Sequence, residues 1–437
     1  MDMSYLASYY YPLIGIGVGL YLLFYFLYRR SIVSISDPLN TGLALVAFYL
    51  AGALILPWLY PVNWSYVCIV ILIFIYIAAG ALFSRKRRPA KMPRLAVKPG
   101  PQLLFTVALT GLLVLNLIMN QIFGVIPLLQ GVQSHSAAVP EPSLYLLAPD
   151  IAVMLLLVFL LTEIRKVKLV AGTGVAVSFL STILAGSKSA IFIFLGALLV
   201  TDYVLHLKLN SSHLKDERLV LTRKIRTVRK AAIICAVVIL ALLPAYLVLI
   251  GADSGGGAGG GVENMITRLF GGFDGLAIIA FKNIDIMSIR GVNISDFYFY
   301  PFIKKLSHTP EFQSTGPYLI YLLSGSSEFA TSGLNPNSSF PIELLLSNGS
   351  LVISGVLITL TAAVVFRLRS VLLVRGGVRM IDLVFWILLV LGPFSVLLDG
   401  SYYIIKSYLL LGLYMALNLV VTAITWLRPG RKVFRLF

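Results

Sequence analysis

The chain has 437 residues, of which 59% are hydrophobic and only 12% are charged. This composition excludes a water-soluble domain and the length excludes a single anchor, so the sequence predicts a polytopic membrane protein. The formal net charge of +17 would favour a nucleic-acid partner for a soluble domain. Most basic residues, however, lie in short segments between apolar runs, as the positive-inside rule predicts. Nucleic acid is therefore excluded as a partner.

Apolar runs close to the length of a membrane-spanning helix, about 20 residues, recur along the whole chain. They predict one integral membrane domain, residues 1–437, that is all α-helical with about eleven transmembrane helices. The predicted spans are 11–29, 42–61, 65–84, 102–123, 147–164, 168–186, 189–207, 231–251, 349–367, 379–398 and 401–427.

The distribution of lysine and arginine predicts the orientation of these spans. If successive helices alternate in direction, all but seven of the 35 basic residues lie on one face, which we assign to the cytoplasm. The N-terminus is then outside and the C-terminus inside. Basic residues on the outer face oppose this bias, and an anionic ligand would explain them as well as lipid phosphates would. They are Lys188, Arg268, Lys282, Arg290, Lys304, Lys305 and Lys406.

The segment 252–348 separates two predicted spans and is the one large external loop, which in a Gram-negative cell lies in the periplasm. Its first part, Val262–Ile286, is predicted as a helix at the membrane surface or dipping into a cavity. Stepping 100° per residue places Gly271, Gly272 and Gly275 on the same face as Arg268. Such a face would admit a bulky anionic group, although glycines also serve tight packing between helices.

Two further positions have features that suit a phosphate group. Arg290 follows this helix and can bind phosphate oxygens in a bidentate way. Lys188 lies in the turn Ala185-Gly-Ser-Lys-Ser-Ala190, where an ammonium and free backbone N–H groups come together, although a plain polar turn with an interfacial anchor explains it equally. The turn is not a P-loop, because Ser187 stands where that motif needs glycine.

Few side chains in the external loop can accept a proton. Glu343 directly precedes an apolar run, where burial would raise its pKa toward that of a useful base. His308 is the other candidate base, although a lone histidine is usually structural. Aromatic residues of this loop suit either sugar faces or an interfacial belt. They are Phe297, Tyr298, Phe299, Tyr300, Phe302, Tyr318, Tyr321, Phe329 and Phe340.

Three blocks in this order resemble the Wzy-type polymerases of O-antigen and enterobacterial common antigen, the oligosaccharide repeat-unit polymerase family. The blocks are Ala185–Ala197, Thr267–Ala277 leading to Asn283-Ile-Asp285, and Asn335–Glu343 continuing through Gly349. Lys188 stands where the family usually has arginine, whereas Arg268 matches a family arginine. The Arg-x10-Gly pattern of some members is missing, because Ile279 and Pro301 occupy the two positions where its glycine would stand.

The resemblance implies a GT-C-like fold in the bacterial inner membrane and a metal-independent, inverting glycosyl transfer on the periplasmic side, with no cofactor. The implied partners are an undecaprenyl-diphosphate-linked oligosaccharide, the lipid bilayer and a chain-length regulator protein. Arg268, Arg290, Lys188, Lys304 and Lys305 would bind the diphosphate, and Glu343 or His308 would be the base. An O-antigen ligase, which transfers the glycan to lipid A core, and a lipid-linked oligosaccharide flippase are the alternatives.

Overall fold

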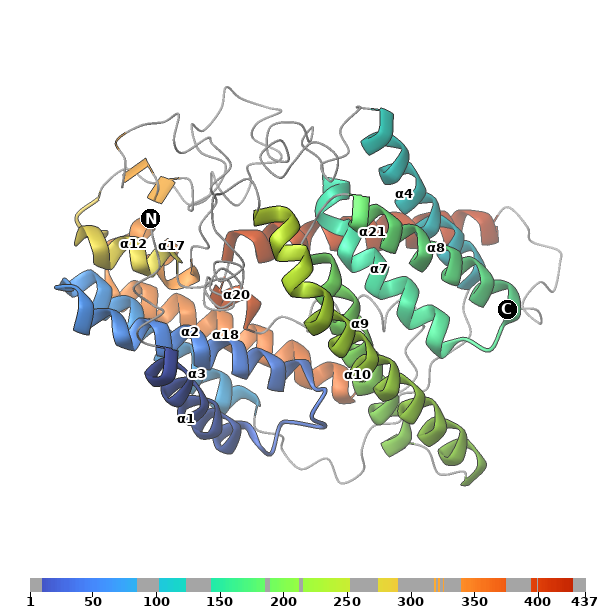
Figure 1. Ribbon diagram of the computed structural model, residues 1–437, viewed down its shortest axis with the longest axis horizontal. Coiled ribbons are helices and arrows are strands. Elements are labelled where there is room, and N and C mark those ends of the chain that lie inside the picture. Colours follow the sequence, from blue (N-terminus) through green and yellow to red (C-terminus); the bar gives the residue numbers. More distant parts are fainter. Residues whose placement is uncertain are drawn as a thin grey trace. The chain divides into compact units, whose positions relative to one another are not determined.

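The computed structural model describes residues 10–84, 102–122, 143–184, 189–211, 215–251, 274–289, 339–374, 394–398 and 400–426, together with 318, 319, 321, 322 and 325 (Figure 1). Over these residues the protein is helical, without a strand. The helices are α1 (Tyr10–Tyr28), α2 (Pro38–Leu59), α3 (Trp64–Ser84), α4 (Gln102–Ile122), α7 (Ser143–Leu161), α8 (Arg165–Leu184), α9 (Ser189–Ser211), α10 (Lys215–Gly251), α12 (Asp274–Lys282), α17 (Phe340–Asn348), α18 (Leu351–Val374), α20 (Ser395–Leu398) and α21 (Gly400–Trp426).

Every predicted span coincides with a helix except 379–398, most of which lies outside the described residues. Among the described helices, five are long and apolar enough to cross a membrane, namely α1, α2, α3, α18 and α21. The chain is therefore a multi-pass membrane protein. The count of about eleven spans and the orientation remain predictions.

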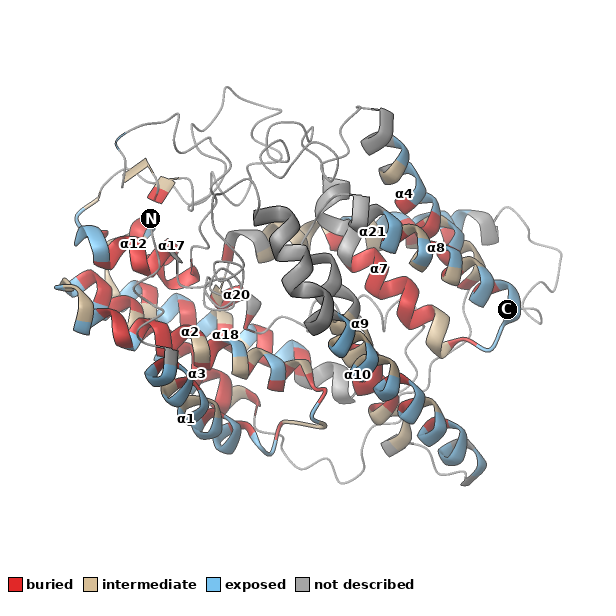
Figure 2. Cartoon of the chain, viewed as in Figure 1, coloured by how far each residue is buried: buried red, intermediate tan, exposed pale blue. Residues whose placement is uncertain are grey.

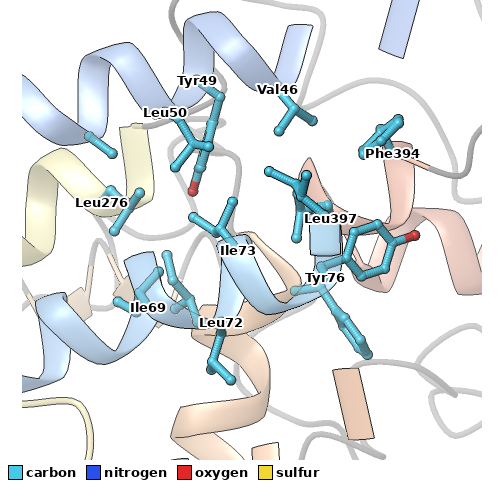
Figure 3. Packing of buried hydrophobic residues seen from close by; sticks show 14 of the residues in the cluster. Val46, Tyr49, Leu50, Ile69, Leu72, Ile73, Tyr76, Leu276, Phe394 and Leu397 are labelled. Atoms are coloured by element: carbon cyan, nitrogen blue, oxygen red, sulfur yellow. The ribbon is translucent and has the colours of Figure 1, made fainter. Parts of the chain in front are cut away.

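Contacts between Cα atoms divide the chain into two compact units. The first contains residues 1–88, 244–371 and 390–405, and its core is built by α1, α2, α3, α12, α17, α18 and α20. Figure 3 shows the apolar side chains of α2 and α3 in this core meeting Leu276, Phe394 and Leu397. At one end of it, Tyr28, Tyr76, Phe366 and Phe394 form an aromatic cluster, in which the rings of Phe366 and Phe394 have centroids 5.7 Å apart. This packing holds α1, α3 and α18 together.

The second unit contains residues 89–243, 372–389 and 406–437. Within it α7 packs against α4, α8 and α9, and α4 also packs against α8. The segment 209–230, which separates the predicted spans 189–207 and 231–251, is largely helical, because α9 extends to Ser211 and α10 begins at Lys215. Leu221, Ile225 and Val228, spaced by three and four residues, form a buried seam with Leu205 of α9.

Candidate functional site

The short helix α17, which precedes α18 directly, positions Glu343. Ser339 is its N-cap residue and has an extended backbone. Pro341 is the second residue of the helix, and its fixed φ suits a first helical turn. The helix ends at Gly349, whose positive φ of 58° is readily adopted by glycine and whose N–H donates to Leu345 O at 2.8 Å. Both ends of α17 are therefore encoded locally, and Glu343 falls in its first turn.

Glu343 is completely buried, with 0% of its surface exposed. All residues of α17 from Phe340 to Leu346 are buried, and the helix packs against α3 and α20. The Glu343 carboxylate also approaches the first residue of α21: a Cβ atom on Gly400 would lie 2.6 Å from Glu343 Oε2. The burial expected for Glu343 is confirmed. Glu343 therefore lies in the first turn of α17 and next to the first residue of α21.

The helix α12, which lies within the segment Val262–Ile286, differs from the helix predicted there. Residues 275–280 are all buried, against α2 and α3, so this part of Val262–Ile286 does not lie at a surface. Of the predicted glycine face only Gly275 is described, whereas Arg268, Gly271 and Gly272 lie outside the described residues. The helix ends at Lys282 rather than Ile286, because Asn283 adopts a positive φ of 51°. The N–H of Asn283 donates to Ala280 O, and the N–H of Ile284 donates to Ile279 O. These two hydrogen bonds form a Schellman motif.

The chain that leaves α12 is fastened to the start of α3. Ser65 Oγ donates a hydrogen bond to Asp285 Oδ1, and the N–H of Met287 donates to Ser65 Oγ at 3.2 Å. Asp285 Oδ1 also accepts from the N–H of Met287 at 3.3 Å. This arrangement holds Asp285, an exposed carboxylate, at the surface of the first unit beside the N-terminus of α3.

Two of the seven basic residues predicted to be external lie within the described residues, and each has a partner. Lys282 Nζ lies 5.7 Å from the centroid of the Phe281 ring. Lys406 on α21 forms an ion pair with Asp150 on α7, with Nζ 2.8 Å from Oδ1 and the aspartate side chain only 6% exposed. A buried carboxylate thus explains Lys406 without any anionic ligand. Sequence reasoning missed this pair. It could have been predicted, because one apolar run contains a single acid and another contains a single base.

Three of the aromatic residues of the loop are described. Tyr318 and Tyr321 stack with ring centroids 6.3 Å apart, and both are half-buried. Burial first, and then the neighbouring Tyr321, raise the pKa of the Tyr318 phenol. Phe340 is 5% exposed and belongs to the core of the first unit, so it fits neither the sugar-facing nor the interfacial-belt interpretation. It packs inward because it opens a helix that is buried on all sides.

The other predicted site residues lie outside the described residues: Arg268, Arg290, Lys188, Lys304, Lys305 and His308. Their convergence on Glu343 stays a prediction. Among the residues that the structure describes, no three His, Cys, Asp or Glu side chains gather into a group that could hold a metal ion. Comparison of the chain with protein-family models, with curated proteins and with solved structures finds no match.

Proposed function

We propose that this membrane protein is a glycosyltransferase that polymerises undecaprenyl-diphosphate-linked oligosaccharide repeat units into O-antigen or a similar surface polysaccharide. The proposal joins the order of the three sequence blocks to one structural observation. That observation is the position of Glu343, a carboxylate wholly buried in a short helix at the entrance of a spanning helix. A buried carboxylate in this position is a candidate proton acceptor for the reaction.

In the proposed reaction the anomeric carbon of the growing glycan is attacked by a hydroxyl of the terminal sugar of a new repeat unit. The new C–O bond forms as the bond to the diphosphate oxygen breaks, with inversion at that carbon. Glu343 accepts the hydroxyl proton, and undecaprenyl diphosphate leaves with the bonding electrons. Arg268, Arg290 and Lys188, with Lys304 and Lys305, would stabilise the charge that develops on it, without a metal.

The finer architecture belongs to the same proposal. About eleven spans of GT-C-like arrangement would lie in the bacterial inner membrane, with segment 252–348 in the periplasm. Ser65, the second residue of α3, binds Asp285 beside the end of that apolar helix, as expected if the chain that follows α12 lies outside the membrane.

The test is a set of substitutions in the native cell, read by gel analysis of surface polysaccharide. Glu343→Gln keeps the shape and removes the base, and Arg268→Ala removes a diphosphate cation. Each is expected to leave single repeat units on the lipid core and to lower long chains by 100-fold or more, as general-base and electrostatic contributions indicate. Asp285→Asn is the matched comparison, and long chains are expected to persist, because that carboxylate already accepts from Ser65.

The gel separates the rival activities. Lipid core without any antigen in both Glu343→Gln and Arg268→Ala would indicate a ligase instead. Unchanged long ladders in both variants would refute the assigned site. Protein amounts in the membrane are measured in parallel, so that a variant that does not accumulate is not counted as inactive.

A further inference from the structure

The first half of α10 has two faces of opposite character. Leu221, Ile225 and Val228 are buried in the seam against α9. Stepping 100° per residue places Arg223, Arg226 and Lys230 on the opposite face, within about 60° of one another. All residues of this second face, which we call the basic face (Arg223, Arg226 and Lys230), are exposed (Figure 2).

The neighbouring basic residues of α10 are used differently. Lys224 forms an ion pair with Glu163, and Arg229 Nε lies 3.0 Å from Asp202 Oδ1. In the part of the chain that the structure describes, no ion pair involves Arg223, Arg226 or Lys230. The basic face therefore carries three positive charges that no carboxylate among the described residues neutralises through an ion pair.

The same face becomes apolar further along the helix. Ile233 and Ile234 are each 63% exposed and Val237 is 58% exposed, and they continue the direction of Lys230. In a membrane protein an exposed aliphatic stripe faces lipid chains. The basic face is thus continuous with a lipid-facing stripe on one uninterrupted helix, α10, which Figure 1 shows as a single long element.

The predicted span 231–251 would place the basic face at or just beyond the level of the lipid headgroups. The predicted span begins at residue 231, and a rise of about 1.5 Å per residue puts the Cα atoms of Lys230, Arg226 and Arg223 roughly 2, 8 and 12 Å beyond it. The headgroup zone is about 5–8 Å deep on each side, and long basic side chains extend toward it. Arg218 lies about 20 Å beyond the span, outside this zone.

We propose that Arg223, Arg226 and Lys230 form a binding surface for anionic phospholipid headgroups of the leaflet from which α10 emerges. The surface holds the α9–α10 hairpin at the membrane and is independent of the glycosyl transfer proposed above. Lys and Arg side chains at this level bind the phosphate groups of lipids. Each basic residue near an anionic membrane surface strengthens binding to that surface about fivefold. The aliphatic stripe beneath specifies lipid rather than a soluble anion.

The test uses the full-length protein in nanodiscs of phosphatidylcholine containing increasing fractions of phosphatidylglycerol. The melting temperature at each fraction gives an apparent affinity for the anionic lipid. The triple variant Arg223→Gln/Arg226→Gln/Lys230→Gln is expected to bind phosphatidylglycerol at least tenfold more weakly, and 1 M NaCl is expected to abolish the difference from the natural chain. In pure phosphatidylcholine the two melt alike, because the substituted side chains make no described internal contact.

Single substitutions provide a matched control. Lys230→Gln is expected to weaken the lipid response about fivefold, whereas Arg218→Gln, off this face and beyond the headgroup zone, leaves it unchanged. An unchanged response in the triple variant would overturn the proposal, as would equal effects of Lys230→Gln and Arg218→Gln. If inorganic phosphate in pure phosphatidylcholine reproduces the stabilisation, the surface is a general anion site and the assignment to lipid is wrong.

Discussion

Arg369 of α18 and Asp37, which precedes α2, form an ion pair in the interior of the first unit. Arg369 Nη2 lies 2.7 Å from Asp37 Oδ2, and the two side chains are only 3% and 0% exposed. Asp37 also caps α2 by accepting from the N–H of Leu39 at 2.9 Å, and it accepts from the N–H of Val33. Arg369 donates in addition to Ser31 O. The turn between α1 and α2 is therefore fixed to α18.

Removing one partner of this pair is expected to destabilise the protein strongly. Arg369→Met leaves the Asp37 carboxylate buried without its counter-charge, at a cost of about 3–5 kcal/mol. The double variant Asp37→Asn/Arg369→Met should recover most of that loss, because asparagine still caps α2 and no charge remains. Thermal unfolding in detergent measures both. Equal losses in the single and double variants would contradict the assignment.

The ion pair Asp150–Lys406 allows a test of whether Lys406 acts on substrate. Lys406→Met leaves a buried aspartate without its cation and should lower the melting temperature. Asp150→Asn/Lys406→Met removes both charges and should restore stability and polysaccharide synthesis together, if the lysine serves only Asp150. Recovery of the melting temperature without recovery of synthesis would instead assign Lys406 to the anionic substrate.

The long helices could be predicted because a buried or lipid-facing span requires a run of consecutive apolar residues. The predicted span 65–84 and the observed α3, Trp64–Ser84, differ by one residue. Glu343 was found for the same reason, since an acid beside an apolar run is expected to be buried. Contacts over long sequence separation could not be predicted: Ser65 and Asp285 are 220 positions apart, and neither carries a signal for the other.

The two short segments show where local reasoning was incomplete. The pattern of α12 continued through Ile286, but a left-handed Asn283 ends the helix earlier, and asparagine signals such a turn less strongly than glycine does. The segment 209–230 was not predicted to be helical, although the spacing of Leu221, Ile225 and Val228 indicates an amphipathic helix.

The left-handed turn at Asn283 predicts opposite outcomes for two substitutions. Asn283→Gly should be neutral or slightly stabilising, because glycine adopts a φ of 51° without strain. Asn283→Val should cost about 1–2 kcal/mol, because a β-branched side chain clashes with the backbone in this conformation. Melting temperatures of the two variants check the prediction, and similar values for both would contradict the Schellman motif.

The pair Glu163–Lys224 predicts a small dependence of stability on pH. The hydrogen bond from Lys224 lowers the pKa of Glu163, so the pair stabilises the folded state above the unfolded pKa of about 4.3. That contribution disappears as the pH falls through the folded pKa. Because Glu163 is 75% exposed, the effect should stay below about 1 kcal/mol. The melting difference between the natural chain and Lys224→Gln should therefore be present at neutral pH and vanish as the pH falls through the lowered folded pKa of Glu163.

Gly400, the first residue of α21, lies against the Glu343 side chain of α17, and replacing Gly400 tests this close contact. In Gly400→Ala the new Cβ would lie 2.6 Å from both Glu343 Oε2 and Phe340 Cδ2, so these two side chains of α17 must shift. We expect a loss of about 1–3 kcal/mol in stability and a loss of long polysaccharide chains. Gly412→Ala on the same helix is the control, since its Cβ meets nothing within 4 Å. If Gly400→Ala matches Gly412→Ala in melting temperature and in the polysaccharide gel, the close contact between Gly400 and Glu343 does not exist in the membrane.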